Sequence, residues 1–259
     1  MMEGMEGEAD ALYLFGILSE AKTSAMSKSM PKGFREDDEL RFQGLGEPGW
    51  TALVEPTEQL LWTGPAAEEK LQDVKWVGPR AIVHEQIVHW AYERFGSFYP
   101  SNLGTIFSDA KALQEGIEEQ RDTLSAYFST TEGCDQYSLK GYVDVARWRQ
   151  NHSVDEASDG SDYLRRRARQ GAKTLPMETL RGDAEALLRR LRAVVKEVDI
   201  TQGKAKKDED GRRRIFGWHL LVPRAAQSEL RQVLETTAPE LSSLLELDFL
   251  GPLPPYRFR

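Results

Sequence analysis

The spacing of apolar positions changes several times along the first half of the chain, and each change predicts a different element. A nearly continuous apolar run at 12–18 predicts a central β-strand. Two further strands are expected at 40–43 and 51–56, with a glycine-rich turn between them. Apolar residues at helical spacing predict the following helices, the last two separated by a strand–turn–strand segment: 66–74, 80–95 beginning at Pro79, and one from the Ser108–Asp109 cap to about 129.

The second half has a clearer order of elements. Alternating apolar residues predict a strand at about 136–147, followed by a polar connection and a long helical region that Pro176 interrupts. Two strands flanking a charged hairpin tip, a helix and a last strand complete the set, at 198–201, 215–222, 225–237 and 244–250. The order β-α-β-β-α-β is that of the ferredoxin-like split βαβ motif.

The predicted fold class is therefore α+β with two domains. Residues 1–10 have no apolar periodicity and are expected to form a mobile acidic tail. An N-terminal α+β domain is expected at 11–108. Residues 109–259 are expected to form a modified ferredoxin-like domain with a connecting helix, a long helical insertion and a proline-rich C-terminal tail.

That tail is a candidate contact site. Proline fixes φ and has no N–H, so the last strand is expected to stop at Gly251 and an extended, stiff segment to follow. Two readings remain open: the tail packs on its own protein, or it is a docking element for a partner. The residues that would make these contacts are Pro252, Pro254, Pro255, Tyr256 and Phe258.

Composition narrows the class of protein. Of 259 residues, 40% are apolar and 29% are charged, which suits a soluble protein with real cores. No apolar run is long enough to span a bilayer and the start is acidic, so we expect no membrane contact and no export. Most of the net charge of −8 belongs to residues 1–60, and the nearly neutral remainder makes nucleic acid an unlikely partner. A cytoplasmic protein is expected.

No motif for catalysis, metal or cofactor binding emerges. Gly44 to Gly49 formally match G-x-G-x-x-G, but Pro48 lies inside the motif and a strand follows, so we interpret it as a turn. His84 and His89 are five residues apart and therefore point about 140° apart around a helix, which prevents them from sharing a metal. Cys134 has no second cysteine to pair with. We therefore predict that the protein is not an enzyme and has no catalytic, metal or cofactor site.

One charged cluster opens the long helical region. It consists of Arg165, Arg166, Arg167 and Arg169. Arginine clusters suit phosphate or carboxylate recognition, but they also suit a solvated helix face with local ion pairs. RNA binding on a ferredoxin-like sheet would additionally need exposed aromatic residues on the central strands. A binding module for RNA or a small effector is thus the alternative function.

Four stretches resemble the GvpF/GvpL family of gas vesicle proteins in order and at plausible spacing. Residues 12–17 resemble the opening Y-L-Y-G-I strand, and 100–107 resemble P-x-R-F-G-T-x-F. Residues 162–167 are similar to A-Y-L-x-x-R, and 250–258 resemble the closing G-P-W-P-P-Y-S-F. The departures are Asn102 and Leu103 in place of Arg-Phe, Leu253 in place of Trp, and Arg257 in place of Ser.

The resemblance implies two α+β domains, the second a modified ferredoxin fold. It also implies a non-enzymatic accessory role in gas vesicle formation, through binding to the shell protein GvpA and to other Gvp proteins. In this reading the tail, Pro252 to Phe258, is expected to lie as a strap on the protein's own body.

Overall fold

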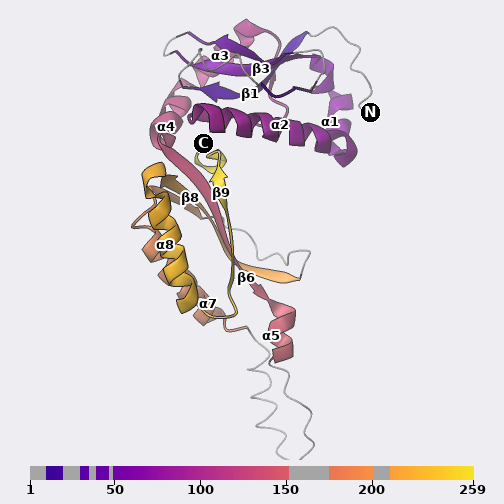
Figure 1. The fold of residues 1–259 in the computed structure, drawn as a ribbon. Coiled ribbons are helices and arrows are strands. Elements are labelled where there is room, and N and C mark those ends of the chain that lie inside the picture. The colour runs from indigo at the N-terminus through magenta and orange to yellow at the C-terminus, as the bar shows by residue number, and fades with distance from the viewer. Residues whose placement is uncertain (1–9, 20–29, 35–38, 47–48, 152–174, 201–210) are drawn as a thin grey trace, which may run out of the picture. The chain divides into compact units, whose positions relative to one another are not determined.

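A computed structural model describes residues 10–19, 30–34, 39–46, 49–151, 175–200 and 211–259 (Figure 1). The expected mobile tail at 1–10 lies, except for Asp10, outside these residues. The chain divides into two compact units. The N-terminal unit contains residues up to Gly133 together with Pro254–Arg259, and the C-terminal unit contains Cys134–Leu253. The N-terminal unit is therefore built from two segments that are far apart in the sequence.

The N-terminal unit is organised around β1 (Ala11–Leu18), the predicted central strand. Its sheet has the order β2-β3-β1-β4, and a further strand, β5, also pairs with β1. All of these pairings are antiparallel. The bounds are Arg41–Gly44 for β2, Thr51–Thr57 for β3, Phe98–Pro100 for β4 and Ile106–Phe107 for β5. The glycine-rich segment at 44–49 joins β2 to β3 as a hairpin and opens no helix.

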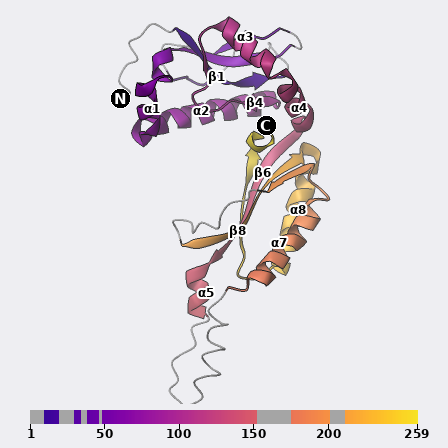
Figure 2. The same cartoon turned by 180° about the vertical axis from the view of Figure 1, so that it is seen from behind.

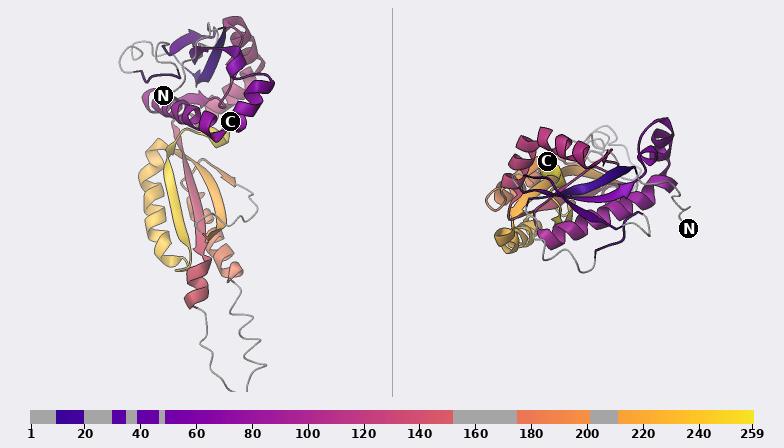
Figure 3. Two further views of the ribbon diagram at one scale, coloured as in Figure 1. Left: turned by 90° about the vertical axis from the view of Figure 1, so that its right-hand side faces the viewer. Right: turned by 90° about the horizontal axis from the view of Figure 1, so that it is seen from above.

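Helices cover both faces of this sheet (Figures 1 and 3). Long α2 (Val74–Phe95) packs on one face, where Tyr13 and Phe15 of β1 meet Ile87 and Val88 in one buried cluster. Helices α3 (Ala110–Glu119) and α4 (Arg121–Thr131) pack on the other face against Leu14 and Ile17. Alternate residues of β1 thus serve two cores, which explains its nearly continuous apolar sequence. Short α1 (Pro65–Gln72) precedes α2.

Gly16 marks an irregularity in this central strand. The register between β1 and β3 shifts between Leu14 and Gly16. A Cβ atom at Gly16 would lie 2.3 Å from the Phe98 ring and 2.4 Å from the backbone oxygen of Tyr99. Only glycine lets β4 approach β1 this closely.

The C-terminal unit contains a four-stranded sheet in the order β7-β8-β6-β9, with every neighbouring pair antiparallel. The strands are β6 (Cys134–Asp144), β7 (Glu197–Ile200), β8 (Arg212–Pro223) and β9 (Glu246–Leu253). Helices α7 (Met177–Leu191) and α8 (Gln227–Thr237) lie side by side on the sheet (Figure 2). Their apolar residues share one core with the sheet, including Leu187 of α7 and Leu230 of α8. A short α5 (Val145–Asn151) follows β6.

Several boundaries differ from the sequence predictions. Helix α2 begins at Val74 and contains Pro79, because Asp73 caps it by accepting from the Lys75 N–H at 2.9 Å. The single helix expected after Asp109 is two helices, α3 and α4, although Asp109 caps the first as predicted. Strand β6 ends at Asp144, three residues earlier than expected. Strand β9 continues to Leu253 through Pro252, which an edge strand tolerates since one side needs no N–H.

The two compact units meet at Gly133, whereas the sequence expectation placed the domain boundary after residue 108. Helices α3 and α4 account for the difference. Leu113, Ile117 and Leu124 are buried against Trp50 and Val54 of the N-terminal sheet. An apolar face gives no indication in the sequence of which sheet it covers.

Candidate functional site

The C-terminal tail is fixed to the N-terminal unit by specific polar contacts. Pro254 and Pro255 are buried, and a 3₁₀ turn at Tyr256–Phe258 follows them. The Tyr256 hydroxyl donates a hydrogen bond to Oε2 of Glu85 on α2 at 2.8 Å. The Tyr256 ring packs against the core between α2 and the sheet. Burial, followed by the hydrogen bond to the Glu85 carboxylate, raises the pKa of Tyr256.

Arg259, the last residue, contributes a second set of contacts. Its Nη1 donates to the Pro100 carbonyl and its Nη2 to Oδ1 of Asn102, each at 2.9 Å. Its Nε donates to the Tyr256 carbonyl at 3.1 Å, which closes the turn. The tail thus joins α2 to the segment between β4 and β5. Asn102, a departure from the pattern of the resembled family, is one of the acceptors.

The tail residues named in the sequence analysis are divided by this arrangement. Pro254, Pro255, Tyr256 and Phe258 belong to the N-terminal unit, whereas Pro252 belongs to β9 of the C-terminal unit. Phe258 is half-buried. Sequence reasoning missed Glu85, on an exposed helix face, and Arg259. No local pattern marks either of them, because the contact between Tyr256 and Glu85 joins positions 171 residues apart.

A buried histidine lies beside this tail. His84 is 5% exposed, and its Nδ1 is 2.8 Å from the Tyr13 hydroxyl. That hydroxyl accepts from the Gly104 N–H at 3.0 Å, so its proton is directed to His84 Nδ1. Burial lowers the pKa of His84 to about 4, a hydrogen bond to the Ser101 backbone opposes this, and the charge on Arg259 lowers it further. A neutral imidazole therefore links β1, α2 and the residues that receive the tail.

None of the groups with possible reactivity forms a catalytic or metal site in the part of the chain that the structure describes. His89 is half-buried and lies 3.3 Å from Glu93, away from the buried His84. Burial raises the pKa of the Cys134 thiol. Among the described residues, no group of three or more His, Cys, Asp and Glu is placed to hold a metal ion. The arginine cluster, Arg165, Arg166, Arg167 and Arg169, lies outside the described residues.

The central strand aromatics do not form an exposed stacking surface. Phe216 and Trp218 stack on each other with ring centroids 3.9 Å apart. Both are buried in the core beneath α7 and α8, at 9% and 4% exposure. They therefore lack the accessibility that base stacking on a ferredoxin-like sheet requires.

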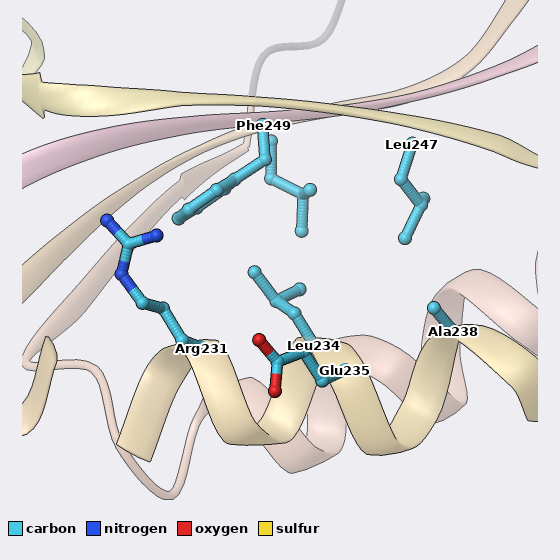
Figure 4. Close-up of a pocket in the computed structure, with 7 residues that line it drawn as sticks. Arg231, Leu234, Glu235, Ala238, Leu247 and Phe249 are labelled. Atoms are coloured by element: carbon cyan, nitrogen blue, oxygen red, sulfur yellow. The ribbon is translucent and has the colours of Figure 1, made fainter. Parts of the chain in front are cut away.

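The C-terminal unit has an apolar groove between its sheet and α8, which we call the α8–β9 groove (Figure 4). Its volume is about 280 Å³. Leu139 of β6 and Leu247 and Phe249 of β9 line the sheet side. The helix side is lined by Arg231, Leu234 and Glu235, with Ala238 just beyond the end of α8. Leu234 and the sheet residues point toward one another across the groove.

A second apolar surface lies on the N-terminal unit. The exposed large apolar residues at the start of α2 are Val74 and Ile82, at 76% and 60% exposure. They are eight positions apart and share one helix face with Gly78, on which a Cβ would have open space. No helix of the described part is long and apolar enough to cross a membrane.

Comparison with known proteins gave one family and a set of related folds. The family model for "Gas vesicle synthesis protein GvpL/GvpF" matches residues 11–259. The crystal structure of the gas vesicle protein GvpF from Anabaena sp. PCC7120 is 16% identical, with a TM-score of 0.66, and the match covers 96% of this chain and 95% of that one. The crystal structure of GvpF from Microcystis aeruginosa is 15% identical, with a TM-score of 0.63 and coverage of 96% and 98%. A search of curated proteins found no match.

Proposed function

This chain belongs to the gas vesicle synthesis GvpL/GvpF family, and we propose that it is a non-enzymatic accessory protein of gas vesicle formation. In this role it binds the shell protein GvpA and other Gvp proteins and supports nucleation or assembly of the vesicle. The observation that carries the proposal is the family match, which extends over residues 11–259 and so includes both compact units. The proposal places the protein in the cytoplasm, associated with the vesicle.

A physical reason for such a protein follows from the nature of the shell. A subunit built from apolar strands would aggregate in water before it is incorporated. A soluble protein that covers an apolar strand and offers a sheet edge would keep the subunit in solution and present it for assembly. Two features of this chain suit that task, an open sheet edge at β9 and exposed apolar residues on α2.

We assign the C-terminal unit to the modified ferredoxin-like fold. Its strand order, with α7 and α8 on one face of the sheet, supports this assignment. We further propose that Pro254, Pro255, Tyr256 and Phe258 act as a structural strap and that Pro252 leads into it. The hydrogen bond from Tyr256 to Glu85 supports a strap over a free docking peptide, since the anchor is already occupied.

Co-expression with GvpA tests the proposal. We expect the protein to be recovered in a complex with GvpA, and the soluble fraction of GvpA to rise when the protein is present. Deleting its gene should reduce or abolish vesicles, measured by flotation and electron microscopy. The proposal is wrong if GvpA is neither bound nor kept soluble and if vesicles form normally without the gene.

A further inference from the structure

The last strand of the C-terminal sheet has a free side. In the described part of the chain β9 is the terminal strand, paired only with β6. Its backbone N–H and C=O groups on the outer side are thus available to another strand. Pro252 has no N–H, so the stretch suited to pairing is Glu246 to Gly251. Leu250, 63% exposed, lies within it.

The α8–β9 groove runs along this same edge. Leu247 and Phe249 are two positions apart in β9, so both point to the α8 side of the sheet. A strand added beside β9 would likewise place alternate residues on that side. Two of its side chains, about 7 Å apart, would then lie over the groove. The apolar lining favours apolar side chains at those two positions.

Two charges of opposite sign mark the helix side of the groove. Arg231 and Glu235 are one turn apart on α8, and both are exposed. No ion pair involves either of them within the described residues. They suit a partner whose apolar residues are flanked by an acidic and a basic side chain in the complementary order.

We propose that the edge of β9 and the α8–β9 groove bind an extended apolar segment of a partner polypeptide, which joins the sheet as a fifth strand. Main-chain hydrogen bonds to residues 246–251 hold the segment, and its alternate apolar side chains enter the groove. The groove volume of about 280 Å³ falls at the lower limit for small-molecule pockets, whereas a strand uses both the groove and the free edge. This inference rests on the proposed function, in which the segment belongs to the shell protein.

A pair of tryptophan substitutions on the same part of the chain tests this site. Ala238 is exposed and lines the groove, so Ala238→Trp fills the space that the segment needs. Gln232→Trp adds the same side chain at an exposed position of α8 that does not line the groove, and is the matched control. Each variant is co-expressed with GvpA as the probe, and the complex is quantified after affinity purification.

The groove proposal predicts at least a tenfold loss of bound GvpA for Ala238→Trp and none for Gln232→Trp. Amide hydrogen exchange in residues 246–251 should slow at least tenfold in the wild-type complex. If Ala238→Trp disturbs folding, exchanging the charges by Arg231→Glu with Glu235→Arg replaces it, and weaker binding is again expected.

Other outcomes overturn the proposal. Unchanged binding by a folded Ala238→Trp variant would reject the groove and leave the accessory function intact. Loss of binding in Ile82→Arg, with Ala238→Trp normal, would move the site to the exposed apolar face of α2. If the wild-type protein binds no GvpA, the proposed function itself fails, and the strand-docking inference fails with it.

Discussion

The buried His84 should make the stability of the N-terminal unit depend on pH. In the folded protein its pKa is about 4, against an ordinary value of 6.5. Between these values the unfolded chain binds a proton that the folded chain does not, so stability falls as the pH is lowered from 6.5 to 4. The full pKa difference corresponds to about 3 kcal/mol, and roughly 2 kcal/mol of it is lost between pH 7 and pH 5.

The perturbation is His84→Asn, which removes the titrating ring and leaves an oxygen that can accept from the Tyr13 hydroxyl. The variant should be less stable at pH 7, because the smaller side chain leaves a gap in the core around Phe15. Its additional loss of stability on acidification to pH 5 should be smaller than that of the wild type by about 2 kcal/mol. The carboxylates titrate equally in both proteins, so they cancel in this difference.

Because the chain has two compact units, the measurement must report on the N-terminal unit alone. Hydrogen exchange of peptides from β1 and α2, followed along a urea series at pH 7 and pH 5, does this. His89→Asn, which removes an imidazole from the same helix outside the core, is the matched control and should alter stability little. Equal pH dependence in the wild type and in His84→Asn would refute a neutral, buried His84.

Three other predictions follow from single contacts. Deleting residues 256–259 removes the hydrogen bonds to Glu85, Pro100 and Asn102 and should lower the melting temperature of the N-terminal unit by several degrees; an unchanged melting temperature with lost GvpA binding would instead favour a docking peptide. Gly16→Ala should destabilise by about 1–3 kcal/mol, since β4 must move away from β1, whereas Gly182→Ala on the open face of α7 should stabilise by about 0.5–1 kcal/mol; urea denaturation measures both, and equal effects would refute the steric argument. Arg224→Ala should cost about 1–3 kcal/mol by the same assay, because it removes the 3.0 Å contact to the buried Asp135 carboxylate; a neutral effect would mean that Gln227, which also donates to Asp135, is sufficient.

Local patterns predicted most of the strands and helices. The aromatic run of β1, the cap at Asp109 and the hairpin of β7 with β8 appear where apolar spacing and turn residues placed them. Pairing partners more than a hundred residues away are not encoded locally. The sequence therefore did not reveal that α3 and α4 cover the N-terminal sheet, or that β9 continues through Pro252 because it is an edge strand.

The tail was recognised from its prolines and aromatic residues, but its contacts were not. Stiffness and aromatic anchors are local properties, whereas the choice between a strap and a docking peptide depends on which groups receive Tyr256. Glu85 and Asn102 are exposed polar residues of ordinary type, and nothing in their neighbourhood marks them as acceptors. The α8–β9 groove was missed for a similar reason, because it is formed where β6, β9 and α8 meet.

The position of the tail has a consequence for how the N-terminal unit forms. Its sheet and the helices on both faces are complete by Gly133, but the groups that receive the tail gain their partners only from the last four residues. During synthesis the C-terminal sheet must be made before Tyr256 and Arg259 exist. Since loop closure over such a separation costs entropy that only the final contacts offset, docking of the tail should be a late step. Full stability of the N-terminal unit then depends on a complete chain, which couples the quality of one end of the protein to the other.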